Sequence, residues 1–211
     1  MDVYSTEKEQ IDQIKKWWGE NGKAIIFGLV LGLGGLYGYR YWDSSRVAEG
    51  QNASINYEHL LAIASDGASD EATEAGNAII SGYPKSTYAK LSALVLAKLA
   101  VDVRDLDEAK SRLRWVIENS NEGEIKPLAQ ARLAQLHLAE GKVEDAASIV
   151  SELDPAYIDQ FTELRGDILL AQGQPDAARS KYSQALEDSQ DRGDAGESIH
   201  LKIDNLSVTG Q

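Results

Sequence analysis

Small residues recur at a fixed spacing in this chain, and this repeat constrains the fold more than any other feature. Three sets share steps of seven, five and four residues: Ala97, Arg104, Ala109 and Leu113; Ala134, Gly141, Ala146 and Val150; Gly166, Gly173, Ala178 and Tyr182. Two antiparallel helices approach closely only where neither carries bulk at the crossing. The residue four positions after the second small one falls on the same helical face and fills the seam. The spacing therefore predicts three helical hairpins.

The residues at the expected turns agree with this prediction. Gly141 and Gly173 stand where a helix can end in the left-handed conformation, and Pro175 suits a first helical turn. Arg104 takes the glycine position in the first hairpin, so that turn is degenerate. The spacing resembles the tetratricopeptide repeat, a helical pair of about 34 residues. The resemblance is partial, because Gln130 and Thr162 stand where the first helix of that repeat usually carries tryptophan.

The remaining helices extend this array. Residues 44–64 and 69–80 are expected to form a more divergent helical unit that ends before the breaker Gly82-Tyr83-Pro84. Pro127 is expected to open a helix after a loop over residues 119–124, and residues 194–206 to form a capping helix. A single pair cannot bury its apolar face alone, so the units must stack into a curved solenoid.

The first helix of each tetratricopeptide-like unit normally lines the concave side of such a solenoid. That rule predicts a groove that is apolar at one end and acidic at the other. Its expected lining residues are Leu91, Leu94, Lys98, Val101, Leu128, Ala131, Gln135, Leu138, Gln160, Glu163, Asp167 and Leu170. Two interpretations stay open. An extended or helical apolar segment of another protein binds there, or a terminal helix of this chain fills the groove.

A second feature is an uncharged apolar run, AIIFGLVLGLGGLYGY, from Ala24 to Tyr39. Sixteen residues are slightly short for a membrane span, which usually takes about 20. Lys23 and Arg40 can extend outward at the two ends, so residues 23–42 are expected to form one transmembrane helix. The expected interfacial aromatic anchors are Trp17, Trp18, Tyr39, Tyr41 and Trp42. A cleaved secretory signal is disfavoured because no A-x-A-like site follows, and a buried core helix because five glycines would be costly.

The orientation of the span follows from the flanking cations. Four lysines precede it, whereas only Arg40 and Arg46 follow it closely. By the positive-inside rule, residues 1–22 are expected to form a cytoplasmic tail and residues 43–211 to lie across the membrane. Gly28 and Gly32, and Gly34 and Gly38, form small-xxx-small pairs that suit contact with a partner's membrane helix or self-pairing. Spans are also rich in glycine without any partner.

Charge and motifs together disfavour catalysis and nucleic-acid binding. Residues 1–46 carry six basic and six acidic side chains, so the net charge of −13 resides in the remainder, which would be repelled by phosphate backbones. The absence of cysteine excludes disulfides and thiol catalysis. His59, His137 and His200 match no metal-binding spacing, and no nucleotide-binding or hydrolase motif is present. We therefore expect no catalytic, metal-binding or cofactor-binding residues, and an interaction protein instead of an enzyme.

Two terminal stretches and one internal motif carry a closer resemblance. They are the N-terminal YSTEKEQIDQIKKWWGENGKAI, the internal Arg40-Tyr41-Trp42 and the C-terminal LKIDNLS. In these stretches the chain resembles the YfgM family, ancillary subunits of the SecYEG translocon in Gram-negative inner membranes. The resemblance implies a single-pass inner-membrane protein with a periplasmic repeat domain and no cofactor. It also implies three kinds of protein partner: SecYEG, translocating polypeptides, and a membrane-anchored periplasmic chaperone of the parvulin-isomerase type. The chain itself is expected to contact membrane lipid. Self-association, a general membrane scaffold, and a tether that holds a cytoplasmic factor through residues 6–18 remain alternatives.

Overall fold

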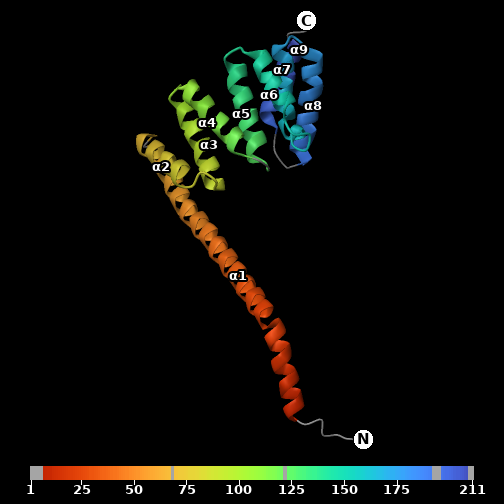
Figure 1. The fold of residues 1–211 in the computed structure, drawn as a ribbon. Helices are drawn as coiled ribbons and strands as arrows, with labels where there is room; N and C mark the ends of the chain where they lie inside the picture. Colours follow the sequence, from red (N-terminus) through yellow and green to blue (C-terminus); the bar gives the residue numbers. More distant parts are fainter. Residues whose placement is uncertain (1–6, 68, 121–122, 192–195, 209–211) are drawn as a thin grey trace. The chain divides into compact units, whose positions relative to one another are not determined.

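The computed structural model describes residues 7–67, 69–120, 123–191 and 196–208, and these residues form helices and turns without a β-strand. In chain order the elements are α1 (Glu7–Ser65), α2 (Ser69–Gly82), α3 (Thr87–Asp102), α4 (Leu106–Asn119), α5 (Ile125–Ala139), α6 (Val143–Ser151), the 3₁₀-helix η1 (Ile158–Phe161), α7 (Thr162–Ala171), α8 (Pro175–Asp191) and α9 (Glu197–Val208) (Figure 1). The chain divides into two compact units, Met1–Gln51 and Asn52–Gln211.

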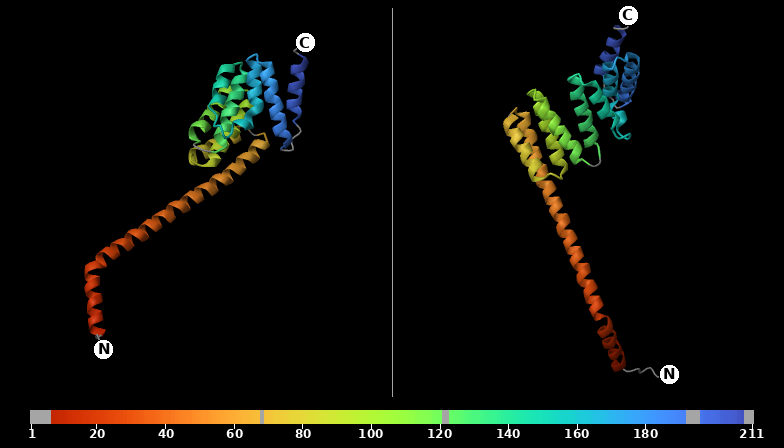
Figure 2. Two further views of the ribbon diagram at one scale, coloured as in Figure 1. Left: turned by 90° about the vertical axis from the view of Figure 1, so that its right-hand side faces the viewer. Right: turned by 45° about the horizontal axis from the view of Figure 1, so that its top comes forward.

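The first unit consists of the N-terminal part of α1. Its stretches Gln10–Lys23 and Ile26–Arg40 are bent by 47° relative to each other, and the bend is visible in the red part of α1 (Figure 2, left). Among the described residues, no straight helix combines the length and hydropathy of a membrane span, whereas this bent pair does so jointly, by length and composition. From Ile26 to Tyr39 the large apolar side chains are all 56% to 80% exposed.

The second unit is a stack of helical hairpins, as the repeat spacing predicts. Helix α3 pairs with α4, α5 with α6 and α7 with α8, and α9 packs on α8. The first helices of successive hairpins also contact one another, α3 with α5 and α5 with α7. Upstream, Leu60 of α1 packs with Ala72 and Ile79 of α2 and with Ala89 of α3, so residues 52–82 form the further unit that the sequence indicated.

The repeated small residues lie at the helix crossings. Ala109, Ala134, Ala146 and Ala178 are fully buried, and Ala97 is nearly so. The residues expected to fill the seams, Leu113, Val150 and Tyr182, are buried too. At the third crossing a Cβ atom on Gly166 would lie 2.5 Å from Cε1 of Tyr182, which is closer than any packed side chain tolerates. The small residues are therefore required by the approach of the helix backbones.

The three hairpin turns share one backbone conformation. The φ angles are 63° at Arg104, 77° at Gly141 and 75° at Gly173. In each turn the next amide donates to the carbonyl five residues earlier, at N–O distances of 2.8 to 2.9 Å. This is the Schellman pattern of helix termination. Among the described residues, Arg104 is the non-glycine residue with a positive φ angle. The first turn therefore keeps the same geometry at a steric cost.

Helix boundaries differ from the sequence prediction in four places. Helix α2 includes Gly82, the first residue of the predicted breaker. Helix α1 continues through residue 44 to Ser65, because no proline interrupts it and a single Gly50 is tolerated. Helix α5 begins at Ile125, so Pro127 is its third residue, where the first-turn amide has no intrahelical partner to lose. Helix α9 is confirmed over 197–208, and the predicted start at 194–195 lies outside the described residues.

Candidate partner-binding surface

The residues predicted to line a groove lie on the first helices of the three hairpins, α3, α5 and α7, with Gln160 on η1. They fall into three classes of exposure. Lys98, Val101, Gln135, Gln160 and Leu170 are exposed; Leu91, Leu128, Leu138, Glu163 and Asp167 are half-buried; Leu94 and Ala131 are buried. The first two classes leave side-chain surface accessible on every one of these helices.

Leu94 and Ala131 pack into the core of the solenoid instead of lining its surface. Leu94 is 6% exposed and packs in one cluster with Leu113 and Leu133, whereas Ala131 is 3% exposed and packs with Ala146 in the next cluster. The predicted helix stripe borders the seam of each hairpin, so residues at its edge turn inward. Both side chains stabilise the stack and offer little surface to a partner.

The part of the surface on α3 and α5 is mainly apolar. Leu91 and Leu128 pack partly against the same core cluster and keep the rest of their side chains accessible. Val101 is 39% exposed. Lys98 Nζ lies 2.8 Å from Asp102 Oδ2, but both side chains are solvated, so this ion pair adds little stability and can exchange partners.

The part of the surface on α7 is acidic, and it is bound by a cation from α9. Lys202 Nζ lies 2.8 Å from Glu163 Oε1 and 2.6 Å from Asp167 Oδ1. The Tyr182 hydroxyl donates to the same Asp167 oxygen at 2.8 Å, and Lys202 Nζ lies 5.5 Å from the centre of the Tyr182 ring. The terminal helix therefore occupies the end of the surface that the sequence predicted to be acidic.

These contacts change the proton affinities of both partners. Burial, aided by the hydrogen bond to Asp167, raises the pKa of Tyr182 far above its ordinary value. Burial alone would lower the pKa of Lys202, but its bonds to Asp167 and Glu163 outweigh that effect and raise it. Lys202 is thus held in its charged form. On the same helix, Ile199 and Leu206 are buried in a cluster with Tyr182, which makes α9 an integral cap of the stack.

A second charged cluster joins consecutive hairpins. The buried Lys110 of α4 lies 2.6 Å from Glu140 Oε1 and 3.0 Å from Asp107 Oδ1, and Lys142 lies 2.8 Å from Glu140 Oε2. Hydrogen bonds from Lys110 and Lys142 lower the pKa of Glu140 to about 2. The cluster fixes the α5–α6 turn against α4. Sequence reasoning missed it, since Lys110 and Glu140 are thirty residues apart and no local pattern pairs them.

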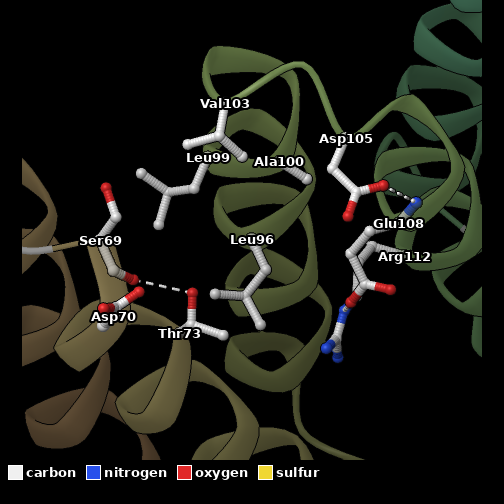
Figure 3. A pocket seen from close by; sticks show the side chains of 10 residues that line it. All are labelled: Ser69, Asp70, Thr73, Leu96, Leu99, Ala100, Val103, Asp105, Glu108 and Arg112. Atoms are coloured by element: carbon white, nitrogen blue, oxygen red, sulfur yellow. Dashed lines mark hydrogen bonds and ion pairs between the residues drawn. The ribbon is translucent and has the colours of Figure 1, made fainter.

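A cavity of about 190 Å³ lies between α2, α3 and α4. Leu96, Leu99 and Ala100 of α3 project into it, while Ser69, Asp70 and Thr73 come from α2 (Figure 3). Its remaining carboxylates already have structural partners: Asp105 Oδ1 accepts from the Glu108 amide at 3.1 Å, and Glu108 Oε1 accepts from Arg112 Nε at 2.6 Å. This cavity shares no lining residue with the predicted groove.

Within the described part of the chain, no three histidine, cysteine or acidic side chains are grouped closely enough to hold a metal ion. Of the three histidines, His137 is buried, and its Nδ1 lies 3.6 Å from Asp145 Oδ2 on α6, beyond hydrogen-bond distance. In the first unit, Gly28, Gly32, Gly34 and Gly38 would each accept a Cβ atom without meeting any atom within 4 Å. Their helix faces are open, and Trp17, Trp18 and Tyr39 are exposed, while the side chains of Tyr41 and Trp42 lie outside the described residues.

Comparison with known proteins extends these observations. A family model described as a tetratricopeptide repeat-like domain matches residues 15–208. The ancillary SecYEG translocon subunit of Escherichia coli (strain K12) is 31% identical over 212 residues, which cover 99% of this chain and 100% of that relative. The chain belongs to the YfgM family of ancillary SecYEG translocon subunits. Another relative of that name, from Aggregatibacter actinomycetemcomitans, is 34% identical over 89% of this chain and 92% of its own length.

The solved structures add a likeness of fold alone. PilF of Pseudomonas aeruginosa superposes with a TM-score of 0.62 over 77% of this chain and 71% of its own, at 14% sequence identity. The Escherichia coli relative matches nearly end to end, and the repeat-like model includes the apolar stretch Ile26–Tyr39 as well as the hairpins. The similarity therefore covers both the apolar stretch and the solenoid.

Proposed function

We propose that this chain is a membrane-anchored protein-interaction subunit that works beside the Sec translocon and assists proteins as they cross the inner membrane. One observation carries the proposal. A helix whose apolar side chains are exposed on every face is joined in one chain to a solenoid with accessible apolar side chains along α3 and α5. The names of the YfgM-family relatives, ancillary SecYEG translocon subunits, supply the partner.

The anchor rests on the exposed stretch of α1. A helix that is apolar all round is suited to lipid, where every backbone hydrogen bond must be satisfied within the segment. Residues 23–42, at about 1.5 Å per residue, reach about 30 Å, the thickness of a hydrocarbon core. The four lysines before the apolar run, Lys8, Lys15, Lys16 and Lys23, favour a cytoplasmic tail of residues 1–22 and a periplasmic domain of residues 43–211.

The span itself offers the translocon a contact surface. Around Gly28 and Gly32, and around Gly34 and Gly38, the open backbone allows a second membrane helix to approach closely. We assign these faces to a membrane helix of SecYEG, with pairing of two copies of this chain as the competing outcome. Gly28→Leu with Gly32→Leu should then reduce co-purification of SecYEG from membranes, whereas Leu29→Ala with Leu33→Ala, on another face, should not.

The solenoid offers the second surface. Leu91, Val101, Leu128 and Leu138 supply accessible apolar area, and Lys98 and Gln135 supply exposed polar groups between them. A polypeptide emerging from a translocon is unfolded and exposes apolar side chains, so it suits such a surface, as does an apolar segment of a membrane-anchored periplasmic chaperone. At the α7 end, Glu163 and Asp167 already pair with Lys202, and we place the contact on α3 and α5.

Site-specific photocrosslinking in intact cells tests the proposal. Crosslinkers at Leu91 and Leu128 should capture exported polypeptides or the chaperone, and one at Gly32 should capture a translocon subunit. A crosslinker at Ser111, exposed on α4, serves as the control. Capture at Ser111 equal to that at Leu91 would contradict the assignment of the surface.

A binding measurement gives the second test. Leu91→Glu with Leu128→Glu should abolish capture while far-UV circular dichroism retains its helical signal. Val103→Glu is the matched control, because Val103 is 64% exposed at the end of α3 and lies outside the predicted surface. Retained capture in the double variant would remove α3 and α5 from the proposal.

A further inference from the structure

The stretch Gln10–Lys23 of α1 differs from the apolar stretch that follows it. Ile11, Ile14 and Trp18 stand three and four residues apart on one helix face and are 49%, 66% and 51% exposed, and Trp17, beside them, is 54% exposed. The opposite face carries Asp12, Lys16, Glu20 and Lys23. This stretch is therefore amphipathic, whereas Ile26–Tyr39 exposes apolar side chains in all directions.

The bend separates the two stretches at the point where their character changes. Gln10–Lys23 and Ile26–Arg40 are inclined by 47°. If Gln10–Lys23 continued a span in a straight line, Asp12, Lys16 and Glu20 would enter hydrocarbon, which is costly for charged side chains. A helix inclined to the span can instead keep its polar face in water and its apolar face against lipid.

Charge indicates the kind of surface that this stretch meets. It carries three lysines, Lys15, Lys16 and Lys23, against two acidic residues, Asp12 and Glu20, in a chain whose net charge is −13. A locally basic, tryptophan-bearing amphipathic helix beside an apolar span complements an anionic lipid surface. The indole of Trp18 covers Gly22, where a Cβ atom would lie 3.2 Å from its Nε1 and Cε2. The ring therefore lies along the helix face near the start of the apolar stretch.

We propose that Gln10–Lys23 is an interfacial helix that lies in the headgroup layer of the membrane. Ile11, Ile14 and Trp18 face the acyl chains, and the lysines contact the phosphates of anionic phospholipids. This inference deepens the proposed function and depends on it for the adjacent span. It assigns the N-terminal segment a lipid ligand in place of the protein ligand that a tether would hold.

Tryptophan quenching in the full-length protein tests the inference. Trp42→Phe with Trp115→Phe leaves Trp17 and Trp18 as the tryptophans of the chain. In vesicles of 70% phosphatidylcholine and 30% phosphatidylglycerol, lipids brominated near the headgroup should quench them at least twofold more than lipids brominated near the chain ends. Aqueous iodide should quench them weakly. Strong iodide quenching without lipid quenching would overturn the proposal, and so would dominant quenching from the chain ends.

Variants separate this inference from the anchor itself. Ile11→Ser with Ile14→Ser should at least halve the shallow-lipid quenching, while Gln10→Ser with Gln13→Ser should leave it unchanged. Lys15→Gln with Lys16→Gln should remove the preference for anionic vesicles over pure phosphatidylcholine; an unaltered preference would contradict the role of the lysines. Alkaline washing reports on the span. Protein that stays embedded while iodide reaches Trp17 and Trp18 refutes the interfacial helix alone, and protein that is washed off refutes the anchor.

Discussion

Glycines at the helix contacts of the solenoid and glycines of the apolar helix have opposite environments. In the solenoid, Gly166 and Gly76 are pressed against Tyr182 and Leu96, with a built Cβ 2.5 and 2.7 Å from the nearest atom. In the N-terminal unit, Gly28 and Gly34 meet nothing within 4 Å, and the leucines around them are exposed. The core of the solenoid is packed by side chains of the chain itself. The large apolar side chains from Ile26 to Tyr39 are exposed, and we propose that lipid and a membrane partner contact them.

The largest expected difference between the two units, in unfolding free energy, comes from shortening an apolar side chain to alanine. Leu113 is 2% exposed at the first hairpin seam, so Leu113→Ala should cost about 2–5 kcal/mol of unfolding free energy through lost burial and a cavity. Leu33→Ala, at a side chain 59% exposed, should leave the unfolding of the solenoid unchanged. Denaturant titration of the full-length protein in detergent micelles, followed by circular dichroism, measures both. Equal effects of the two substitutions would contradict the difference in packing between the two units.

Replacing a glycine with alanine should give the second-largest difference in stability between the two units. Gly166→Ala forces a Cβ into the Tyr182 ring and should destabilise the solenoid by about 1–3 kcal/mol, although alanine favours helix more than glycine does. Gly34→Ala has open space and should not shift the same titration. A stabilised Gly166→Ala protein would show that the crossing is looser than its distances indicate.

The three hairpin turns allow a comparison within the solenoid, between Arg104 and the glycines at the equivalent positions. Arg104→Gly should stabilise the protein by about 1 kcal/mol, because the left-handed conformation costs an ordinary residue about 1–2 kcal/mol. Gly141→Ala and Gly173→Ala, at the equivalent positions, should destabilise it by a similar amount. The measurement is the midpoint of thermal unfolding. A loss of stability in Arg104→Gly would mean that the Arg104 side chain does more than occupy the turn.

The smallest expected effect depends on pH. The pKa of Glu140 is lowered to about 2 from its ordinary value of 4.5, so its bonds stabilise the folded state above pH 4.5 and are lost as the pH falls toward 2. Glu140→Gln should lower the unfolding midpoint at neutral pH, and the difference from wild type should vanish near pH 2. Glu144→Gln, at an exposed carboxylate, is the control. A difference independent of pH would remove the carboxylate charge as its cause.

The repeat was predictable because close helix crossings demand small residues, and that demand leaves a spacing in the sequence. Ala109, Ala146 and Ala178 are buried where the spacing placed them. The degenerate turn at Arg104 did not obscure it, since the backbone hydrogen bonds of that turn do not depend on the side chain. The fold could thus be derived from local pattern and steric demand.

The charges at the surface could not be derived in this way. Asp167 was predicted to line a groove that either a partner or a terminal helix of this chain would fill. It binds Lys202 of the terminal helix α9, thirty-five residues away, and the docking of that helix depends on the completed stack. Leu94 lies in the core although it shares a helix stripe with Leu91 and Lys98, because the boundary between seam and surface depends on the exact rotation of α3. Such details follow from tertiary packing, which local periodicity does not encode.

Cysteine labelling determines on which side of the membrane each unit lies, and because the chain has no native cysteine, each variant carries a single reactive thiol. Single variants Gln13→Cys and Ser111→Cys would be treated with a membrane-impermeant maleimide in cells whose outer membrane has been permeabilised. We expect Ser111→Cys to be labelled at once and Gln13→Cys to be labelled only after the inner membrane is opened. Labelling of Gln13→Cys alone, or of both at equal rates, would contradict an anchored solenoid on the outer side of that membrane.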